Sequence, residues 1–439
     1  MMLRSSFPRR HSLFALVLLT SCTGVQPVSA GDYWPPPTEP QSIDRTYSPT
    51  VHTVQLFKRG FEMSPPVLEL GGGEPLVLRF DDLQSNTEYL SYTYVHCDRN
   101  WQPSDLSPAQ YIQGAPTDVL PPPNQSFNTL QFYLQYEVEV PNEMMQPKLS
   151  GNYLLKVYRG SDQEDLILTR RFLVIEQRVQ IDARMVATRD VDRRDVDQQI
   201  DLTIRHPGVT VRDPFSDLHV VMLQNFRWDD ARSGFRPKFI RDNELVYDYP
   251  KEGLFAGGNE WRFFDMKNTR YSTAQMARIT TSPEGLEEGF LLPDEKREFK
   301  MYFDLPDING KQLVRNDIAD GDPLGADYIY MNFVLPRTEP LSDEVYVYGG
   351  FSDMQCRPEF KCTWDPKLRA YTLRALMKQG YVNYAYAVLS RGSAIPDLAQ
   401  LEGSHFQTEN DYLVLVYLTD YQLRCDRLVG ARFLNSRRG

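Results

Sequence analysis

The residues best suited to chemistry in this chain are its histidines and cysteines, which supply general bases, nucleophiles and metal ligands. Only one histidine stands next to a cysteine, His96 beside Cys97. Neighbouring residues on a strand point to opposite faces, so these two side chains cannot form a nucleophile–base pair. The other histidines have no ligand spacing to a second His or Cys; they are His11, His52, His206, His219 and His405. We therefore expect neither a catalytic residue nor a metal site.

Other motifs that could carry chemistry are incomplete. Gly71-Gly72-Gly73 is followed by Glu74, which would repel a phosphate, and lacks the Gly-Lys-Ser/Thr of a P-loop. No Gly-x-Ser-x-Gly occurs. Asp304–Gly310 has Leu305 where an EF-hand needs a spaced oxygen ligand, and residues 316–327 form an acidic loop that we interpret as solvated. The sequence predicts no enzyme, no cofactor and no small-molecule substrate.

The N-terminus has the pattern of an export signal, with Arg4, Arg9 and Arg10 before a short apolar core. Two cleavage sites remain open. Leu19-Thr20-Ser21-Cys22 resembles a lipobox, in which Cys22 is lipidated and residues 1–22 are removed. Val28-Ser29-Ala30 suits an ordinary signal peptidase, which would remove residues 1–30. Residues 31–50 are rich in Pro, Ser and Thr and are expected to be a tether.

Export permits disulfide bonds. The cysteines after Cys22 are Cys97, Cys356, Cys362 and Cys425, and none forms a Cys-x-x-Cys. Cys356 and Cys362 are close enough in sequence to bridge one local loop, and this is the disulfide that we predict.

The composition excludes several classes of protein. The net charge of −11 argues against a nucleic-acid binder, which would carry a basic face. No apolar run after the N-terminus approaches the ~20 residues of a membrane helix, so a lipid on Cys22 is the membrane contact that we expect. A chain of 439 residues suggests about three domains.

Short strands separated by turns predict an all-β chain without long helices. Tyr92 and Tyr94 alternate with Thr93 and Val95, and Ser107-Pro108-Ala109-Gln110 predicts one short helical turn. A linker near residues 336–342 precedes the last group of strands. We predict three tandem immunoglobulin-like or early-set β-sandwich domains, at residues 51–177, 178–338 and 343–437.

Two segments mix aromatic and charged residues, namely residues 225–230 and 257–265. Such residues either fill a core or anchor an interface, because Trp, Tyr and Arg dominate interface energetics. The candidate partner-binding residues are Trp101, Arg227, Trp228, Trp261 and Arg262.

The third range resembles the early-set sandwich of glycogen-binding modules. A strand that ends in Gly-x-Phe precedes Trp364 and Tyr371, and alternating tyrosines close the sheet. Tyr346, Trp364, Tyr371 and Tyr384 either belong to the core or stack on a sugar. A glycan-binding envelope lipoprotein is thus an alternative function, and a scaffold for another envelope complex is a third.

Several stretches together resemble the type IX secretion system plug protein family of Bacteroidota, formerly a domain of unknown function. The most specific is His-Cys-Asp-x-x-Trp-x-Pro-Ser-Asp-Leu at residues 96–106. Others are residues 80–83, 126–130, 149–158, 168–172, 224–230, 257–265 and 402–417.

The resemblance implies a non-enzymatic periplasmic plug. Such a protein would bind the periplasmic mouth of the outer-membrane translocon β-barrel and seal it while cargo is absent. Plug and cargo would exclude each other, so the plug must prefer the empty state of the pore. The implied location is the periplasm, with attachment to the outer membrane if Cys22 is lipidated.

Overall fold

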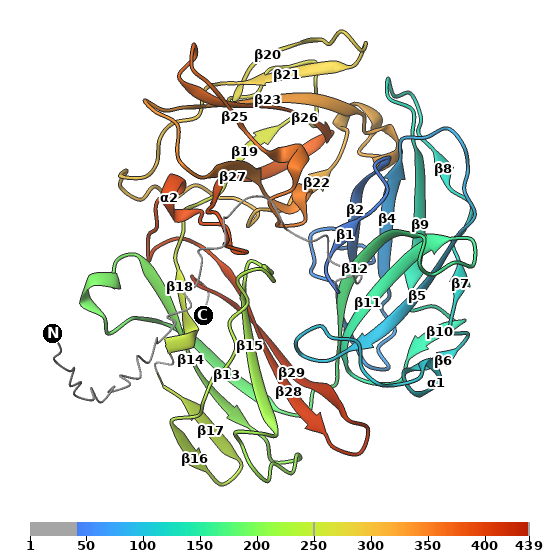
Figure 1. Ribbon diagram of the computed structural model, residues 1–439, viewed down its shortest axis with the longest axis vertical. Helices are drawn as coiled ribbons and strands as arrows, with labels where there is room; N and C mark the ends of the chain where they lie inside the picture. Colours follow the sequence, from blue (N-terminus) through green and yellow to red (C-terminus); the bar gives the residue numbers. More distant parts are fainter. Residues whose placement is uncertain (1–41, 249–250, 438–439) are drawn as a thin grey trace, which may run out of the picture. The chain divides into compact units, whose positions relative to one another are not determined.

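The computed structural model describes residues 42–248 and 251–437, and their regular secondary structure consists almost entirely of β-strands (Figure 1). The expected all-β class is confirmed. Cys22 and the export signal lie outside the described residues. No helix in the described part of the chain has the length and apolarity that a membrane span requires.

The first sandwich consists of two main sheets. One has the order β1-β12-β11-β5-β7, with β3 parallel to β12, and the other has the order β2-β4-β9-β8. A small sheet pairs β6 with β10, and α1 precedes β6. The bounds are β1 Arg45–Thr46, β2 Val51–Lys58, β3 Val67–Glu69, β4 Leu76–Asp82, β5 Leu90–Cys97, α1 Pro108–Tyr111, β6 Ile112–Gly114, β7 Asp118–Val119, β8 Asn124–Gln125, β9 Leu134–Val140, β10 Met145–Pro147, β11 Gly151–Arg159 and β12 Leu166–Ile175.

Strand β5 shows how the sequence positions this core. Tyr92 and Tyr94 belong to the core between the two sheets, while Val95 packs on the opposite side, as the alternation predicts. The helical turn is also confirmed, because the Ser107 N–H donates to Gln110 Oε1 at 2.8 Å. The sheet that contains β5 is buried on both faces, which explains why β12 is apolar at both of its ends, before Thr169 and after Arg171.

The second sandwich pairs segments far apart in the chain. One sheet has the order β13-β14-β17-β16, with β18 beside β14, and the other has the order β15-β28-β29. In Figure 1 the red strands β28 and β29 lie beside the green β15. The bounds are β13 Gln180–Ala187, β14 Asp197–Arg205, β15 Leu218–Gln224, β16 Phe239–Arg241, β17 Glu244–Tyr247, β18 Leu254–Ala256, β28 Asp411–Asp420 and β29 Cys425–Asn435.

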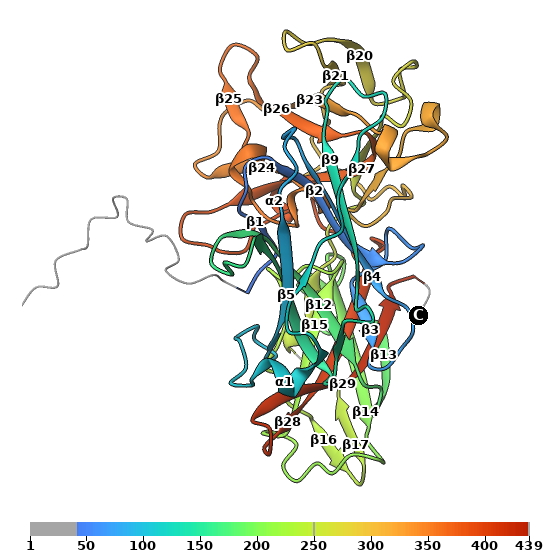
Figure 2. The same ribbon diagram turned by 90° about the vertical axis from the view of Figure 1, so that its right-hand side faces the viewer.

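The third sandwich lies between these segments in sequence. One sheet has the order β20-β21-β23-β26-β25 (Figure 2). In the facing layer, β27 pairs with β19, β22 and β24. A turn of helix, α2, ends at Glu402 and is followed by Gly403 as its C-cap. The bounds are β19 Arg262–Asp265, β20 Met276–Thr281, β21 Glu287–Leu291, β22 Gln312–Val314, β23 Tyr328–Pro336, β24 Glu344–Tyr348, β25 Thr363–Asp365, β26 Ala370–Lys378, β27 Gly380–Leu389 and α2 Ala399–Glu402.

Six short 3₁₀ turns complete the described elements: η1 Val191–Arg193, η2 Lys251–Gly253, η3 Asp317–Ala319, η4 Pro323–Gly325, η5 Gly350–Ser352 and η6 Pro358–Phe360.

The strand pairing does not follow the expected limits at residues 178–338 and 343–437. β19–β23 share their sheets with β24–β27, whereas β28 and β29 complete the core of β14 and β15. We propose that residues 179–256 and 411–435 form one domain and that the third sandwich is inserted between them.

Candidate functional site

The adjacent His96 and Cys97 are buried and separated by the strand. His96 faces Tyr153, and its Nδ1 lies 2.8 Å from Ser104 Oγ, whereas Cys97 packs in the cluster on the other side. Burial lowers the pKa of His96 to about 4 and raises the pKa of Cys97 to about 12. At neutral pH both side chains are therefore uncharged, and the thiol is not an activated nucleophile.

The predicted disulfide between Cys356 and Cys362 is wrong for this structure. Cys97, Cys356, Cys362 and Cys425 are all free thiols. Cys362 belongs to the core of the third sandwich, while Cys356 packs against a separate cluster around Trp261. The two side chains thus serve different clusters, and closeness in sequence does not bring their sulfur atoms together.

Trp101 and Trp228 hold the first and second sandwiches together. Their rings meet edge to face with centroids 4.8 Å apart. The Arg171 guanidinium lies 4.5 Å from the centroid of the Trp101 ring and 5.5 Å from that of Trp228. Both tryptophans belong to, or pack on, an apolar cluster shared by β12 and β28. We call this cluster the tryptophan junction.

Arg227 connects the second sandwich to the third. Its Nη2 donates to Asp229 Oδ2 at 2.8 Å, and its guanidinium lies 5.3 Å from the centroid of the Tyr348 ring. The Tyr348 hydroxyl donates to the same Asp229 oxygen at 3.1 Å. Arg227 is buried, so its charge is satisfied by the chain itself.

Trp261 and Arg262 are also internal. Trp261 stacks on Tyr348, and a Cβ on Gly310, whose φ is +76°, would lie 2.7 Å from the indole. Arg262 Nε donates to Glu402 Oε1 at 2.9 Å, and Arg262 Nη1 donates to Asp294 Oδ1 at 3.0 Å.

These positions correct the interpretation of the five candidate partner-binding residues. Trp101, Arg227, Trp261 and Arg262 are buried, and Trp228 is partly buried at the tryptophan junction. An interface anchor must be accessible before its partner arrives. We therefore assign Trp101, Arg227 and Trp228 to the contacts between sandwiches. Trp261 and Arg262 belong to the interior of the third sandwich.

The aromatic residues proposed to stack on sugar are not an open platform. Tyr346, Tyr371 and Tyr384 are buried, and Trp364 packs against the same core. Tyr384 donates to Asp294 at 2.9 Å, and the Tyr371 hydroxyl accepts from the Leu341 N–H at 2.7 Å. Stacking on a sugar needs an exposed ring face, so these positions favour the core interpretation.

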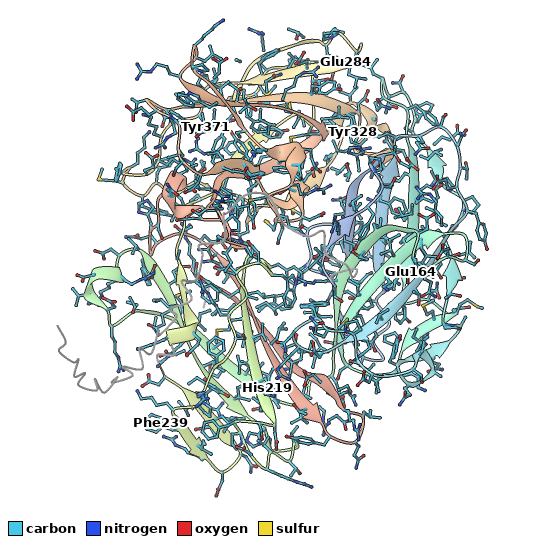
Figure 3. All side chains as sticks on the ribbon, viewed as in Figure 1. Glu164, His219, Phe239, Glu284, Tyr328 and Tyr371 are labelled. Atoms are coloured by element: carbon cyan, nitrogen blue, oxygen red, sulfur yellow. The ribbon has the colours of Figure 1, made fainter. Side chains whose placement is uncertain are left out.

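The first and third sandwiches meet at a buried ion pair. Lys378 Nζ lies 2.7 Å from Asp81 Oδ2, and the two side chains are 0% and 2% exposed. Tyr328, labelled in Figure 3, donates to the same oxygen at 2.7 Å. The Lys378 ammonium also lies 3.3 Å from the centroid of the Tyr133 ring. We call this the lysine junction.

The acidic loop at residues 316–327 belongs to the same contact. The Tyr133 hydroxyl lies 2.9 Å from the Leu324 carbonyl and 3.0 Å from the Ala326 carbonyl. Asp327 Oδ1 accepts from the Gln131 N–H at 3.0 Å. The loop, which the sequence suggested to be solvated, therefore joins two sandwiches.

A cavity of about 620 Å³ is lined by residues of all three sandwiches. Its lining includes Val51 of the first, Trp228 of the second and Phe351 of the third. Arg170 and Arg357 both reach Asp353 there, at 3.2 and 3.1 Å. Among the residues that the structure describes, no group of three His, Cys, Asp or Glu could hold a metal ion.

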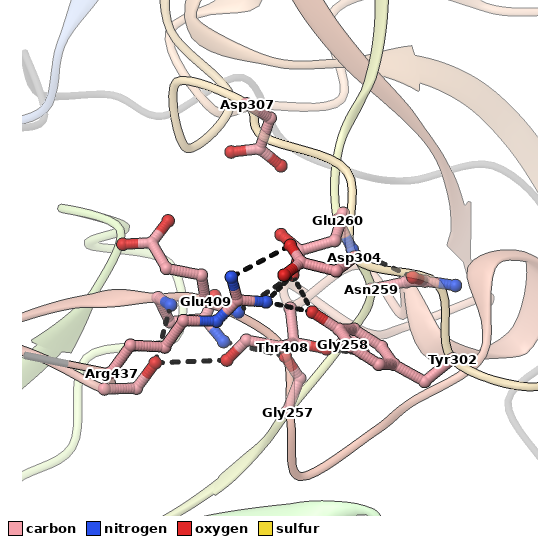
Figure 4. A network of polar contacts seen from close by, with 12 residues as sticks. Gly257, Gly258, Asn259, Glu260, Tyr302, Asp304, Asp307, Thr408, Glu409 and Arg437 are labelled. Atoms are coloured by element: carbon pink, nitrogen blue, oxygen red, sulfur yellow. Dashed lines mark hydrogen bonds and ion pairs between the residues drawn. The ribbon is translucent and has the colours of Figure 1, made fainter.

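A polar network surrounds Glu260, just before β19 (Figure 4). Glu260 Oε1 accepts from Tyr302, from Arg437 Nη2 at 2.9 Å and from the Glu409 N–H at 3.1 Å. Arg437 Nη1 also donates to Asp304 Oδ1 at 2.9 Å. The network ties the segment that carries Tyr302 and Asp304 to the end of β29.

Asp307 lies beside this network. It accepts hydrogen bonds from the backbone N–H groups of Trp261 and Asn309. Burial raises its pKa to about 7, which those hydrogen bonds oppose and the charges of Glu260 and Glu409 reinforce.

Comparison with known proteins gives a family match and a close structural match. Residues 51–176 match the family model "Type 9 secretion system plug protein 1st domain", so the resemblance seen in the sequence is confirmed over that segment. A crystal structure of a hypothetical protein from Parabacteroides merdae superposes with a TM-score of 0.86. It is 29% identical, and the alignment covers 90% of this chain and 100% of that one. No curated protein matches the chain.

Proposed function

Since residues 51–176 carry the first domain of a type 9 secretion system plug protein, we propose that this chain is such a plug. It binds the periplasmic mouth of the outer-membrane translocon β-barrel and closes the pore while cargo is absent. The family match carries this proposal. The function needs no catalytic group and no cofactor, because it depends on occupancy alone.

The contacts between the sandwiches support the proposal that the protein acts as a plug. A protein that closes a wide pore must present a broad and rigid surface. The lysine junction and the tryptophan junction each bury charged or aromatic side chains from two sandwiches. Separating the sandwiches would break these buried contacts and expose the rings of Trp101 and Trp228 to water, which is unfavourable. The three sandwiches are therefore expected to act as one body.

The proposed location is the periplasm, next to the outer membrane. A lipid on Cys22 would hold the protein at that membrane, whereas cleavage after Ala30 would release a freely diffusing plug. Mass spectrometry of the mature N-terminus separates the two. A diacylglyceryl group on Cys22 supports attachment, and an unmodified Gly31 as the first residue contradicts it.

Affinity capture tests the proposed function. Tagged mature protein is incubated with detergent extracts of outer membranes from its own bacterium. We expect it to recover the translocon barrel, and to recover much less when cargo-loaded complexes are added. Failure to recover the barrel from an extract that contains it in the empty state would contradict the proposal.

A further inference from the structure

An exposed apolar segment precedes the acidic turn at Asp307. Phe299, Met301 and Phe303 are 98%, 93% and 73% exposed, although residues of this type are normally buried. They alternate with Lys300, Tyr302 and Asp304. We call residues 299–304 the apolar edge.

The residues between the apolar ones attach the edge to the protein. Tyr302 and Asp304 reach the network of Glu260 and Arg437, and Lys300 pairs with Glu295 (Figure 4 shows the first two). Glu260 itself is buried. Tyr302 thus binds inward between Met301 and Phe303, which point into solvent, whereas Lys300 and Asp304 pair at the surface and stay 51% and 60% exposed.

The backbone of the edge is free to pair. Within the part of the chain that the structure describes, residues 301–305 make no backbone hydrogen bond, and none of them has a positive φ. The segment belongs to no strand of the structure, and an unpaired stretch of backbone of this kind can pair with an added strand; proteins normally blunt such sites with charge. Here the outward side chains are apolar instead.

The charged side chains near the apolar edge indicate what kind of partner binds there. Lys300 pairs with Glu295, and Arg437 pairs with Asp304 and Glu260, so the cations that contact the edge are already neutralised. An anionic lipid surface would be attracted by unpaired basic side chains. An uncharged extended peptide matches both the apolar side chains and the row of unpaired backbone groups.

From these observations we infer that the apolar edge accepts a β-strand of the secretion-system partner, which adds to it by backbone hydrogen bonds. The added strand carries apolar side chains at alternate positions and no charge opposite Phe299, Met301 and Phe303. This inference rests on the proposed function, since it names the surface by which the plug holds its partner.

Three variants test the edge in the capture experiment. Phe299→Ser/Met301→Ser/Phe303→Ser removes the apolar side chains. Met301→Pro keeps the other two but removes a backbone donor. The matched control, Phe239→Ser/Tyr271→Ser/Leu368→Ser, changes three exposed apolar residues elsewhere.

We expect the edge triple variant and Met301→Pro each to recover at least tenfold less translocon than wild type. The control should stay within twofold. Hydrogen exchange at residues 301–305 should slow at least tenfold in the captured complex. Equal recovery by the edge triple variant overturns the inference and leaves the proposed function intact. Loss in the triple variant but not in Met301→Pro overturns strand addition.

A probe peptide separates failure of the edge from failure of the proposed function. If wild type captures no translocon, a ten-residue peptide of alternating valine and threonine is added to the purified protein. Slower exchange at residues 301–305 in wild type, but not in the edge triple variant, supports strand addition. No change overturns it. Edge-dependent dimerisation, or edge-dependent flotation with phosphatidylethanolamine vesicles, also overturns it, because the occupant is then a second copy or a lipid surface.

Discussion

The tryptophan junction and the apolar edge use similar residues in opposite ways. At the junction, Trp101 and Trp228 are enclosed, and Arg171 lies over both rings. At the edge, Phe299 and Phe303 point into solvent, while Lys300 and Asp304 pair with charges of this chain. Both segments mix aromatic and charged residues in sequence. The two segments differ in whether the rest of the chain covers the apolar side chains.

This difference separates stability from binding. Residues of the junctions should control folding, whereas those of the apolar edge should control association and leave folding nearly unchanged. Substitutions at the junctions test the expected effect on folding, and substitutions at the apolar edge test the expected effect on association.

The largest effect is expected from Lys378→Met at the lysine junction. It leaves Asp81 charged and buried, with Tyr328 as a remaining donor. We expect a loss of about 3–5 kcal/mol in the free energy of unfolding, measured by urea denaturation. The control Lys361→Met breaks the exposed pair with Glu344 and should cost less than about 1 kcal/mol. Equal losses would show that the lysine junction is not closed in solution.

Trp228→Ala at the tryptophan junction should cost about 3 kcal/mol, the low end for a tryptophan because this ring is only partly buried. The indole would leave a cavity beside Trp101 and Arg171. Phe239→Ala, at an exposed ring, serves as the control and should change stability by less than about 0.5 kcal/mol. A folded, fully stable Trp228→Ala that fails only to bind the translocon would restore Trp228 as a partner contact.

Asp307 should make the stability depend on pH. Its pKa is raised from 3.8 to about 7 in the folded protein, so the folded state holds more protons than the unfolded state between these values. The free energy of unfolding should therefore fall as pH rises from about 4 to 7, by an amount on the order of 2 kcal/mol. Asp307→Asn should remove this part of the pH dependence. Identical pH profiles for the two proteins would contradict the assignment.

The smallest effect on stability is expected at the apolar edge. Phe299→Ser/Met301→Ser/Phe303→Ser removes side chains that lie almost wholly in water, so the free energy of unfolding should change by less than about 1 kcal/mol. Thermal denaturation checks this directly. A loss comparable to that of Lys378→Met would mean that the edge is packed against the protein in solution.

Local patterns in the sequence predicted local structure well. The alternation at Tyr92 and Tyr94 identified the core face of β5, and Ser107 with Gln110 identified the start of α1. These features depend on residues within one strand or turn. The specific run at residues 96–106 also led to the family that the first domain matches.

The pairing of β15 with β28 could not be predicted in this way. It joins segments separated by a whole inserted sandwich, and nothing in either strand specifies its partner. The same reasoning explains why the predicted disulfide is not found. Cys356 and Cys362 are close in sequence, but they belong to different clusters.

The candidate site was the least predictable feature. Phe299, Met301 and Phe303 alternate with polar residues, as half-buried strands do, and periodicity alone does not say which face is covered. Trp261 and Arg262 show the reverse case, since residues suited to an interface are enclosed by Tyr348 and Glu402. Only the contacts made in the folded structure distinguish an exposed apolar segment from an enclosed one.

The most direct test is to measure the conductance of the purified, cargo-free translocon in a planar lipid bilayer. The protein is added to the periplasmic side. We predict that it closes the open pore, that the block is reversed by cargo-loaded complexes, and that the edge triple variant blocks at least tenfold less often. A pore whose conductance does not change with saturating wild-type protein would contradict the account of this chain as a plug.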